Sequence, residues 1–475
     1  MLSRRELLLL FALFVASLPA VTARLYSSDE VEYFSYLRSL WFDHDVSFEN
    51  EYRYFYDHRI AQTPDFHQTF LELETATGRR INYGTIGCAI LWAPFYGVAD
   101  ITTRVRQSMG RSVGADGFSQ PYVSAVAFGS AFYGFAAIVL AVAAARQIVG
   151  RYEVSSGLAV WVGTPLLFYM YVAPPFSHAC SAFAVAVFVT VWLRVRETWS
   201  LGGVVVLGLA GALMAMVREQ DLVCGLGPLV DFGLGLVKGK GIRDKGKGKD
   251  ERVKGLQVAA AGVAAFLVGY LPQLIAYQSL NGFPRPSPLV TRKMFWYSPH
   301  ALQVLADPEH GFLFWTPLAL LAIAGLVVLA ARPRAIVRHD MTSNRDVRRI
   351  AGCMLLMVAT QIYISGAVES WTVAGAFGQR RFVGVTIFLV IGLAAFRRWV
   401  DGRAARIAVN ICLVLCVWWN LALTLEFGTS MMDRQKLELR RNAYDAFVTL
   451  PKTAPKLLYR YFTNRSSFYK RGATD

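Results

Sequence analysis

Acidic side chains that could carry acid–base chemistry gather in one stretch near the N-terminus. Residues 24–82 contain eleven of the 33 Asp and Glu residues of the chain, set among many aromatic residues. Asp29 and Glu30 stand at the start of a helical pattern, and Ser27 precedes Glu30 by the spacing of a capping box. Two interpretations stay open. The two acids only cap a helix lying on a membrane surface, or one of them takes a proton from a hydroxyl group.

Side chains that could bind a phosphate come from several distant segments. Arg380 and Arg381 begin an apolar run at a membrane border where positive charge is not expected. An arginine there can hold a phosphate through paired hydrogen bonds. The alternative is that these residues anchor the helix at the interface or pair with Glu369. Further candidates, each of which could instead be a structural residue of a turn or a helix start, are Arg218, His178 and His310.

Composition and apolar patterning predict a membrane protein. Of the 475 residues, 55% are hydrophobic and only 17% are charged, whereas a soluble protein is about a quarter charged. Apolar runs of about 17–25 residues, the length that crosses a bilayer, recur along the whole chain. We therefore predict an all-α polytopic membrane protein with about eleven transmembrane helices, plus juxtamembrane or re-entrant helices in the first outer loop. The predicted spans are 6–23, 121–145, 154–172, 177–195, 201–217, 221–237, 255–278, 312–331, 350–366, 381–396 and 407–425.

The charge pattern sets the orientation of these spans. The net charge is +16, and Lys and Arg concentrate in short loops such as 194–200 and 397–406, which the positive-inside rule places in the cytoplasm. The rule holds along the chain only if the apolar run 83–101 does not span. We therefore predict that this run is a re-entrant or interfacial segment on the outer face. Because the positive charge forms no basic domain, nucleic acid is excluded as a partner.

The predicted organisation is one membrane domain followed by a tail. Residues 1–425 form the transmembrane domain, in which 24–120 is an extracytoplasmic loop with juxtamembrane helices. Within it, the Lys/Gly-rich stretch 238–254 is typical of a flexible basic cytoplasmic linker. The apolar N-terminal run is either a cleaved signal peptide or an uncleaved anchor. The polar stretch that follows fits a loop between membrane helices and favours the anchor. Residues 426–475 mix basic with aromatic side chains and predict an extracytoplasmic interfacial tail.

Several functional classes find no support in the sequence. The chain has no Walker loop, no HExxH motif, no nucleophile elbow and no dinucleotide fingerprint. Its six cysteines form no CxxC pair and are typical of small buried apolar residues. Ionisable residues deep in the predicted spans are scarce, although Asp231 falls in one. This scarcity weighs against a proton-coupled pump.

Three motifs and their order along the chain carry a family resemblance. An N-terminal span precedes the acidic outer loop that opens with Asp29 and Glu30, and a Gly/Pro/aromatic segment follows at the outer face. With this pattern, most of residues 1–400 resembles the GT-C superfamily of lipid-phosphate-dependent glycosyltransferases, which includes the protein O-mannosyltransferases and the lipid A aminoarabinose transferases. Two later patches resemble an uncharacterised bacterial branch of that superfamily. The motifs are Gly84-x-x-Gly87-x-x-x-Leu91-Trp92-Ala93-Pro94-Phe95-Tyr96, His310-Gly311-Phe312-Leu313-Phe314-Trp315-Thr316-Pro317 and Gly375-x-x-Gly378-Gln379-Arg380.

The resemblance implies an inverting sugar transfer on the extracytoplasmic face of the plasma (inner) membrane. The donor would be a polyprenyl-phosphate sugar in the lipid bilayer, and the acceptor a hydroxyl of an unknown glycan, lipid or protein. Asp29 would be the base, with Glu30 as its nearest substitute, and Arg380 or Arg381 would stabilise the leaving phosphate. Arg218, His178 and His310 are further predicted ligands of the donor phosphate.

One departure from the family pattern concerns a metal. Many relatives carry a second acid in the outer turn between the third and fourth spans, whereas this chain reads Pro174-Pro175-Phe176-Ser177-His178 there. The missing acid puts a metal bridge to the donor phosphate in doubt, so no cofactor is predicted with certainty and a divalent metal stays an open alternative. His178 could instead take the place of the acid beside the phosphate. The alternatives to a glycosyltransferase are a membrane transporter or flippase of lipid-linked or small substrates, a ligase of lipid-linked glycans, and a non-catalytic scaffold.

Overall fold

Helices make up nearly all of the regular structure, as the apolar periodicity predicts. The structure, a computed structural model, has no strand among the residues it describes, only two isolated β-bridges. The all-α fold class is therefore confirmed. The described residues are 2–61, 64–237, 249–297, 299–336 and 344–468.

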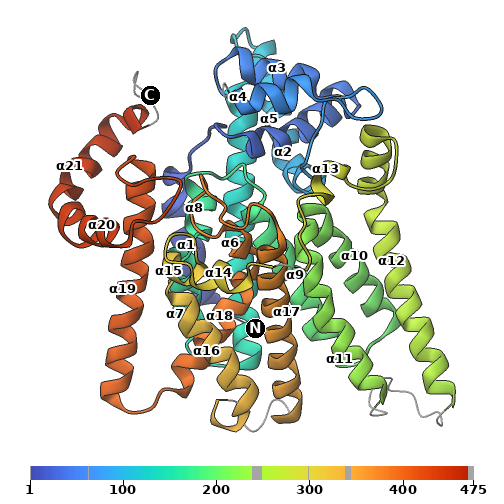
Figure 1. Ribbon diagram of the computed structural model, residues 1–475, viewed down its shortest axis with the longest axis vertical. Helices are drawn as coiled ribbons and strands as arrows, with labels where there is room; N and C mark the ends of the chain where they lie inside the picture. The colour runs from blue at the N-terminus through green and yellow to red at the C-terminus, as the bar shows by residue number, and fades with distance from the viewer. Residues whose placement is uncertain (1, 62–63, 238–248, 298, 337–343, 469–475) are drawn as a thin grey trace.

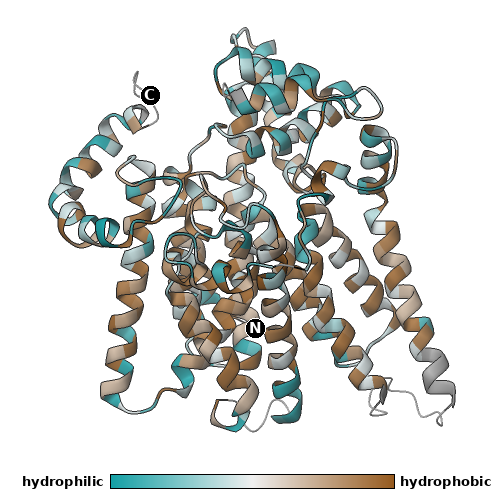
Figure 2. Ribbon diagram, viewed as in Figure 1, coloured by the Kyte–Doolittle hydropathy of each residue, from teal (hydrophilic) through white to brown (hydrophobic). Residues whose placement is uncertain are grey.

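Long apolar helices run through the body of the molecule and identify it as a membrane protein. Hydrophobic residues cover these helices, while hydrophilic residues gather at one end of the body and along the C-terminal helices (Figure 2). In the described part of the chain, six helices are long and apolar enough to cross a membrane. They are α6 (Gln120–Ile148), α9 (His178–Val195), Gly255–Asn281 of α12 (Lys249–Asn281), α17 (Asn344–Ala367), Arg380–Trp399, which joins η6 (Arg380–Val385) to α18 (Thr386–Trp399), and α19 (Arg403–Gly428).

The other predicted spans are shorter helices or helices broken by proline. One predicted span divides at Pro165 into α7 (Glu153–Val162) and α8 (Leu166–Tyr171). Another divides at Pro317 into α15 (Phe312–Trp315) and α16 (Leu318–Ala331). Proline lacks the N–H that would continue the helix. The remaining shorter helices are α1 (Arg4–Ser17), α10 (Leu201–Val217) and, after the 3-10 turn η4 (Glu219–Gly225), α11 (Leu226–Val237). The total of eleven spans therefore stays a prediction.

The ambiguous run 83–101 forms most of one continuous helix, α5 (Gly87–Ser108), despite Pro94 within it. It therefore does not enter and leave the membrane as a hairpin. It also falls outside the six helices that satisfy the length and hydropathy of a span. Against α6, the Trp92 indole donates to the Ser130 hydroxyl at 2.9 Å and the Tyr133 hydroxyl donates to the Leu91 carbonyl at 2.7 Å.

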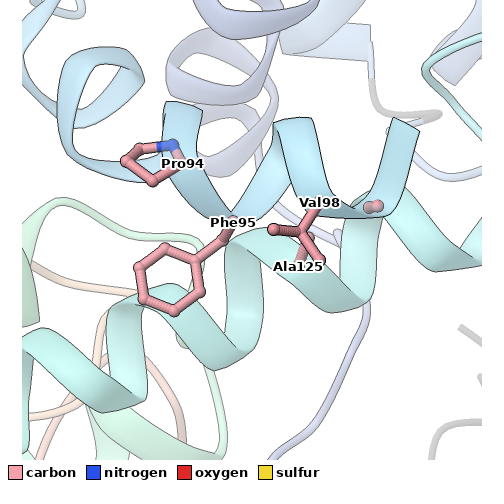
Figure 3. A pocket seen from close by; sticks show the side chains of 5 residues that line it. Pro94, Phe95, Val98 and Ala125 are labelled. Atoms are coloured by element: carbon pink, nitrogen blue, oxygen red, sulfur yellow. The ribbon is translucent and has the colours of Figure 1, made fainter. Parts of the chain in front are cut away.

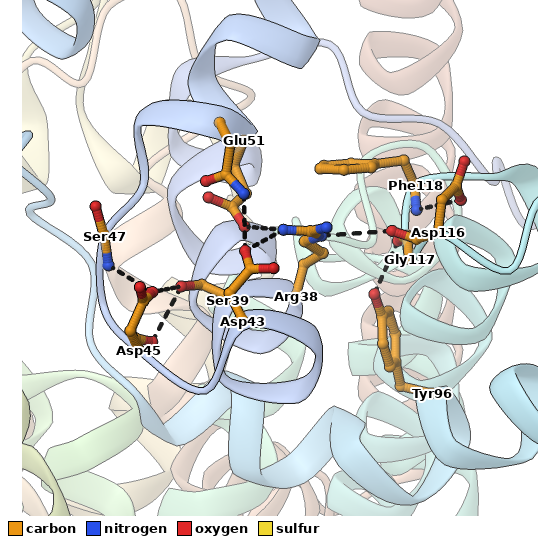
Figure 4. Close-up of polar contacts among 11 residues, drawn as sticks. Arg38, Ser39, Asp43, Asp45, Ser47, Glu51, Tyr96, Asp116, Gly117 and Phe118 are labelled. Carbon is orange, nitrogen blue, oxygen red and sulfur yellow. Dashed lines mark hydrogen bonds and ion pairs between the residues drawn. The ribbon is translucent and has the colours of Figure 1, made fainter.

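Three short helices, α2 (Ser28–Arg38), α3 (Glu49–Asp57) and α4 (Pro64–Phe66), cover one end of the helical body (Figure 1). We call them the cap. Arg38 organises its polar contacts (Figure 4): the guanidinium pairs with Asp43, donates to Glu51 at 3.0 Å, and donates to the Asp116 carbonyl at 3.4 Å. Nearby, Tyr96 of α5 donates to the Gly117 carbonyl at 2.8 Å. These hydrogen bonds therefore hold the cap helices together and join the cap to the segment that leads into α6.

A buried ion network ties three helices together and tests the predicted sidedness. Asp231 of α11 is fully buried and pairs with Arg196 after α9 at 2.8 Å and with Arg349 of α17 at 2.6 Å. Trp192 also donates to Asp231 at 3.0 Å. The basic segments around Arg196 and Arg349, which the charge pattern assigns to one side, thus share one end of the fold. The predicted linker 238–254 lies mostly outside the described residues.

The C-terminal segment continues from α19 as α20 (Leu439–Tyr444) and α21 (Leu450–Thr463), which extends beside the helical body (Figure 1). Arg465, after α21, donates to the carbonyls of Pro19 at 2.7 Å and Ala20 at 2.6 Å. The C-terminal segment is therefore joined to η1 (Leu18–Ala20), the turn that follows α1. The interfacial position of residues 426–475 stays a prediction.

We expect the end of the molecule that carries the cap to face outward. A cysteine at exposed Ser108, in a Cys412→Ser background that removes the one exposed native cysteine among the described residues, should react with a membrane-impermeant maleimide added to intact cells. A cysteine at Asp401, whose side chain is 94% exposed between α18 and α19, should react only after permeabilisation. Labelling of the Ser108 position only after permeabilisation would contradict the orientation.

Candidate functional site

The predicted base and a predicted phosphate-binding arginine meet in one ion pair. Asp29 lies in the first turn of α2, and Arg380 opens η6. The Arg380 Nη1 donates to the Asp29 Oδ2 at 2.6 Å across 351 positions of sequence. Both side chains are partly exposed to solvent, Asp29 by 39% and Arg380 by 23%. A substrate can therefore reach the carboxylate and the guanidinium together.

Local sequence fixes the position of Asp29. Ser27 is the N-cap of α2, and its hydroxyl accepts the Glu30 N–H at 3.5 Å. The Glu30 carboxyl reaches back and accepts the N–H groups of Tyr26 at 2.8 Å and Ser27 at 3.1 Å. This completed capping box sets the start of the helix. Asp29 therefore projects from the first helical turn, where the helix dipole favours negative charge.

Glu30, the predicted substitute base, is a capping residue in this structure. Its side chain is fully buried, and burial raises the pKa of its carboxyl to about 8. A carboxyl with that pKa keeps its proton at neutral pH, so it cannot readily accept one from a substrate. The capping interpretation is thus confirmed for Glu30, whereas Asp29 faces Arg380 and its role as a proton acceptor stays a prediction.

Arg218 and His178 form a second contact beside the ion pair. Arg218 follows α10, and its Nη1 donates to the His178 Nδ1 at 2.9 Å and to the Ser177 hydroxyl at 3.3 Å. A guanidinium can only donate, so Nδ1 accepts and the imidazole proton is on Nε2. That Nε2 is buried and has no hydrogen-bond partner in the described structure. The positive charges of three arginines act on the His178 ring: Arg218, Arg380 and Arg381.

Arg381 and His310 are placed differently from Arg380. Arg381 is 7% exposed and donates to the Ser370 carbonyl at 2.8 Å and hydroxyl at 2.9 Å. Arg381 therefore holds the loop before η6, and its buried charge adds to that of the neighbouring Arg380. The His310 carbonyl accepts the Gln379 amide at 2.8 Å, and its ring packs edge-on to Trp371 at 6.1 Å. No contact described here joins the His310 ring to Asp29 or Arg380, and neither arginine forms an ion pair with Glu369 among the described residues.

Two contributors to the site, Phe176 and Gln379, were not predicted as site residues. The Arg380 guanidinium lies over the Phe176 ring at 5.4 Å, in the outer turn where the family pattern places an acid. Gln379 is fully buried and also donates to the Trp371 carbonyl at 3.0 Å. Gln379 thus fixes the segment that directly precedes Arg380. Both residues stand in predicted patches, but their contacts depend on segments far apart in sequence.

An apolar recess of about 430 Å³ lies apart from this chemistry, between α5 and α6. Figure 3 shows Pro94, Phe95 and Val98 from α5 beside Ala125 from α6. These side chains offer no polar group for catalysis. Within the described ranges, no group of three or more His, Cys, Asp or Glu side chains could hold a metal ion.

Comparisons with known proteins identify the fold. No protein-family model matches the chain, and no curated protein matches it. Among solved structures, the chain is similar to ArnT from Cupriavidus metallidurans, crystallised bound to undecaprenyl phosphate. The match has a TM-score of 0.52 and 15% sequence identity, and covers 98% of this chain and 79% of ArnT. The predicted likeness to GT-C aminoarabinose transferases is thereby confirmed for the fold.

The raised pKa of Glu30 predicts a pH-dependent stability of the cap. The folded state binds the Glu30 proton up to about pH 8, whereas an unfolded chain releases it near 4.5. Stability from this group is therefore full below pH 4.5 and declines as pH rises to about 8. Glu30→Gln keeps an oxygen for the capping box and should flatten this decline in thermal unfolding midpoints measured between pH 4.5 and 8.

Part of the decline should survive in that variant, because burial also raises the pKa of Glu51 in α3 to about 7. Identical pH profiles for wild type and Glu30→Gln would contradict the assignment.

Proposed function

We propose that this protein is an inverting glycosyltransferase. It would move a sugar from a polyprenyl-phosphate donor to an acceptor hydroxyl on the extracytoplasmic face of the inner membrane. The observation that carries the proposal is the contact between Asp29 and Arg380. It joins a carboxylate that can take a proton to a cation that can hold a phosphate, in a fold similar to that of a protein crystallised with undecaprenyl phosphate.

The chemistry needs one base and one site for a leaving anion. The acceptor oxygen attacks the anomeric carbon from the face opposite the phosphate, and its proton passes to the Asp29 carboxylate. The bond between the anomeric carbon and the phosphate oxygen breaks, so polyprenyl phosphate leaves with the bonding electrons. A single displacement of this kind inverts the anomeric configuration. The partly open Asp29 carboxylate is suited to the proton transfer.

Positive charge beside Asp29 suits the leaving phosphate. Arg380 is partly open and can exchange its ion pair with Asp29 for phosphate oxygens, which its forked geometry matches. As the sugar leaves, the phosphate gains charge, and cations fixed in advance stabilise it. Arg218 and the buried Arg381 add to this field. The Nε2–H of His178, whose ring contacts Arg218, is a further hydrogen-bond donor without a partner in the described structure.

The residues around Asp29 do not match a metal site. Asp29 is paired with Arg380 and is close to the positive charge of Arg381. The nearby carboxyls of Glu30 and Glu32 are buried and accept backbone N–H groups. The described residues supply no cluster of three candidate ligands. The steps above therefore assign the charge on the phosphate to arginine side chains.

Asp29→Asn should lower transfer by a factor of about 10²–10⁴, because an amide cannot accept the proton. The measurement is incorporation of label from a panel of radiolabelled polyprenyl-phosphate sugars into membranes containing equal amounts of wild type or variant. Asp65→Asn is the matched control, since Asp65 is an exposed acid of the same region and should leave transfer unchanged. Full activity of Asp29→Asn would remove the proposed base.

Arg380→Ala should raise KM for the donor by about tenfold to a hundredfold, because charge-assisted hydrogen bonds to the phosphate are lost. Arg380→Lys should fall between wild type and the alanine variant, since lysine keeps the charge without the fork. Arg53→Ala, which removes an exposed arginine of α3, is the control. Equal donor KM values for Arg380→Ala and Arg53→Ala would show that Arg380 does not bind the donor.

A further inference from the structure

A second polar cluster lies on the other side of the turn that carries Arg218. The adjacent Glu219 accepts hydrogen bonds at one carboxylate oxygen from the hydroxyls of Tyr270 at 2.7 Å and Tyr277 at 2.8 Å. Gln273 lies between these tyrosines at helical spacing on the same face of α12. Tyr36 of α2 lies within electrostatic range of Glu219. We call these five residues the Glu219 cluster, and the proposed reaction uses none of them.

Two groups of the Glu219 cluster have unused hydrogen-bonding capacity. Tyr36 and Gln273 are both fully buried. The Tyr36 hydroxyl and the Gln273 Nε2 have no hydrogen-bond partner in the described structure. The Gln273 Oε1, by contrast, accepts the Ile86 N–H at 2.9 Å, which fixes the orientation of the amide. Buried polar groups are normally paired, so each of these two unpaired groups has capacity for a hydrogen bond to a ligand.

The position of the Glu219 cluster relative to Asp29 follows from α2. Asp29, Tyr33 and Tyr36 recur at helical spacing, so they share one face of the helix. Seven residues of helix separate Asp29 from Tyr36 by about 10 Å along the axis. Arg218 and Glu219 are consecutive in the facing turn. Cations therefore lie beside Asp29 on the side of Arg380, and Tyr36 and Glu219 lie further along the same helix face.

We propose that the Glu219 cluster is the acceptor subsite and that it receives a neutral, polyhydroxylated acceptor, a glycan. The inference rests on the proposed function and names its second substrate. Tyrosine hydroxyls, an amide and a carboxylate together donate to and accept from sugar hydroxyls. The acidic Glu219 repels an anionic acceptor, so the arginine side takes the phosphate donor and the Glu219 side takes the uncharged acceptor.

Tyr36→Phe tests the subsite with little disturbance of the fold. The variant removes one oxygen that has no protein partner, so thermal stability should be equal or higher. The measurement is saturation-transfer NMR on the full chain in lipid nanodiscs, without donor. The probes are methyl glycosides of glucose, galactose, mannose and arabinose, with methyl glucuronide as the anionic match of the glucoside. At least one neutral probe should bind, and Tyr36→Phe should weaken it about three- to tenfold.

Tyr133→Phe is the matched control, because its hydroxyl donates to the Leu91 carbonyl between α5 and α6 and takes no part in the Glu219 cluster. Its probe binding should equal that of wild type, and methyl glucuronide should not compete with the neutral probe. Binding of no neutral probe, equal binding by Tyr36→Phe, or competition by methyl glucuronide would overturn the inference. These readouts need no transfer, so they can fail while donor-dependent transfer by wild type persists. If wild type shows no donor-dependent transfer, the proposed function is overturned instead.

Discussion

The ion pair between Asp29 and Arg380 is the contact that brings α2 of the cap and the start of η6 together. A partly exposed pair contributes about 0–1 kcal/mol at most, so it cannot hold the cap in place by itself. Other contacts do this: the capping box of Ser27 and Glu30, and the network of Arg38. The weakness of the pair fits the proposed function, in which the guanidinium exchanges the Asp29 carboxylate for a phosphate.

The turn after α10 divides the polar interior into two regions of opposite character. Arg218 points to His178 and the cationic side, while Glu219 points to the tyrosines of α12. Consecutive residues in a tight turn can serve opposite sides because their side chains diverge. α2 crosses both regions with Asp29 at one end of its face and Tyr36 further along, so one helix relates the proposed base to both proposed substrates.

The sequence predicted what depends on local pattern. Apolar run length predicted the helical membrane body, and the spacing of Ser27 and Glu30 predicted the capping box that the structure contains. It left two alternatives for the run 83–101, a re-entrant or an interfacial segment, and the continuous helix α5 argues against the re-entrant one. The family resemblance implied separate roles for Asp29 and Arg380 in one reaction, but it did not predict their ion pair. The roles of Gln379 and Tyr36 had no local signal, because their neighbours come from distant segments.

The buried Asp231 network has a mechanical consequence. It fastens α9, α11 and α17 at the end of the molecule opposite the cap, where the buried Asp231 carboxylate pairs with the guanidiniums of Arg196 and Arg349. Separating such partners is costly, because each would remain buried and uncompensated. We therefore expect these three helices to behave as levers with a common pivot at Asp231. Small angular movements about that pivot would be largest at the far tips, where His178 and the chain leading to Arg380 lie.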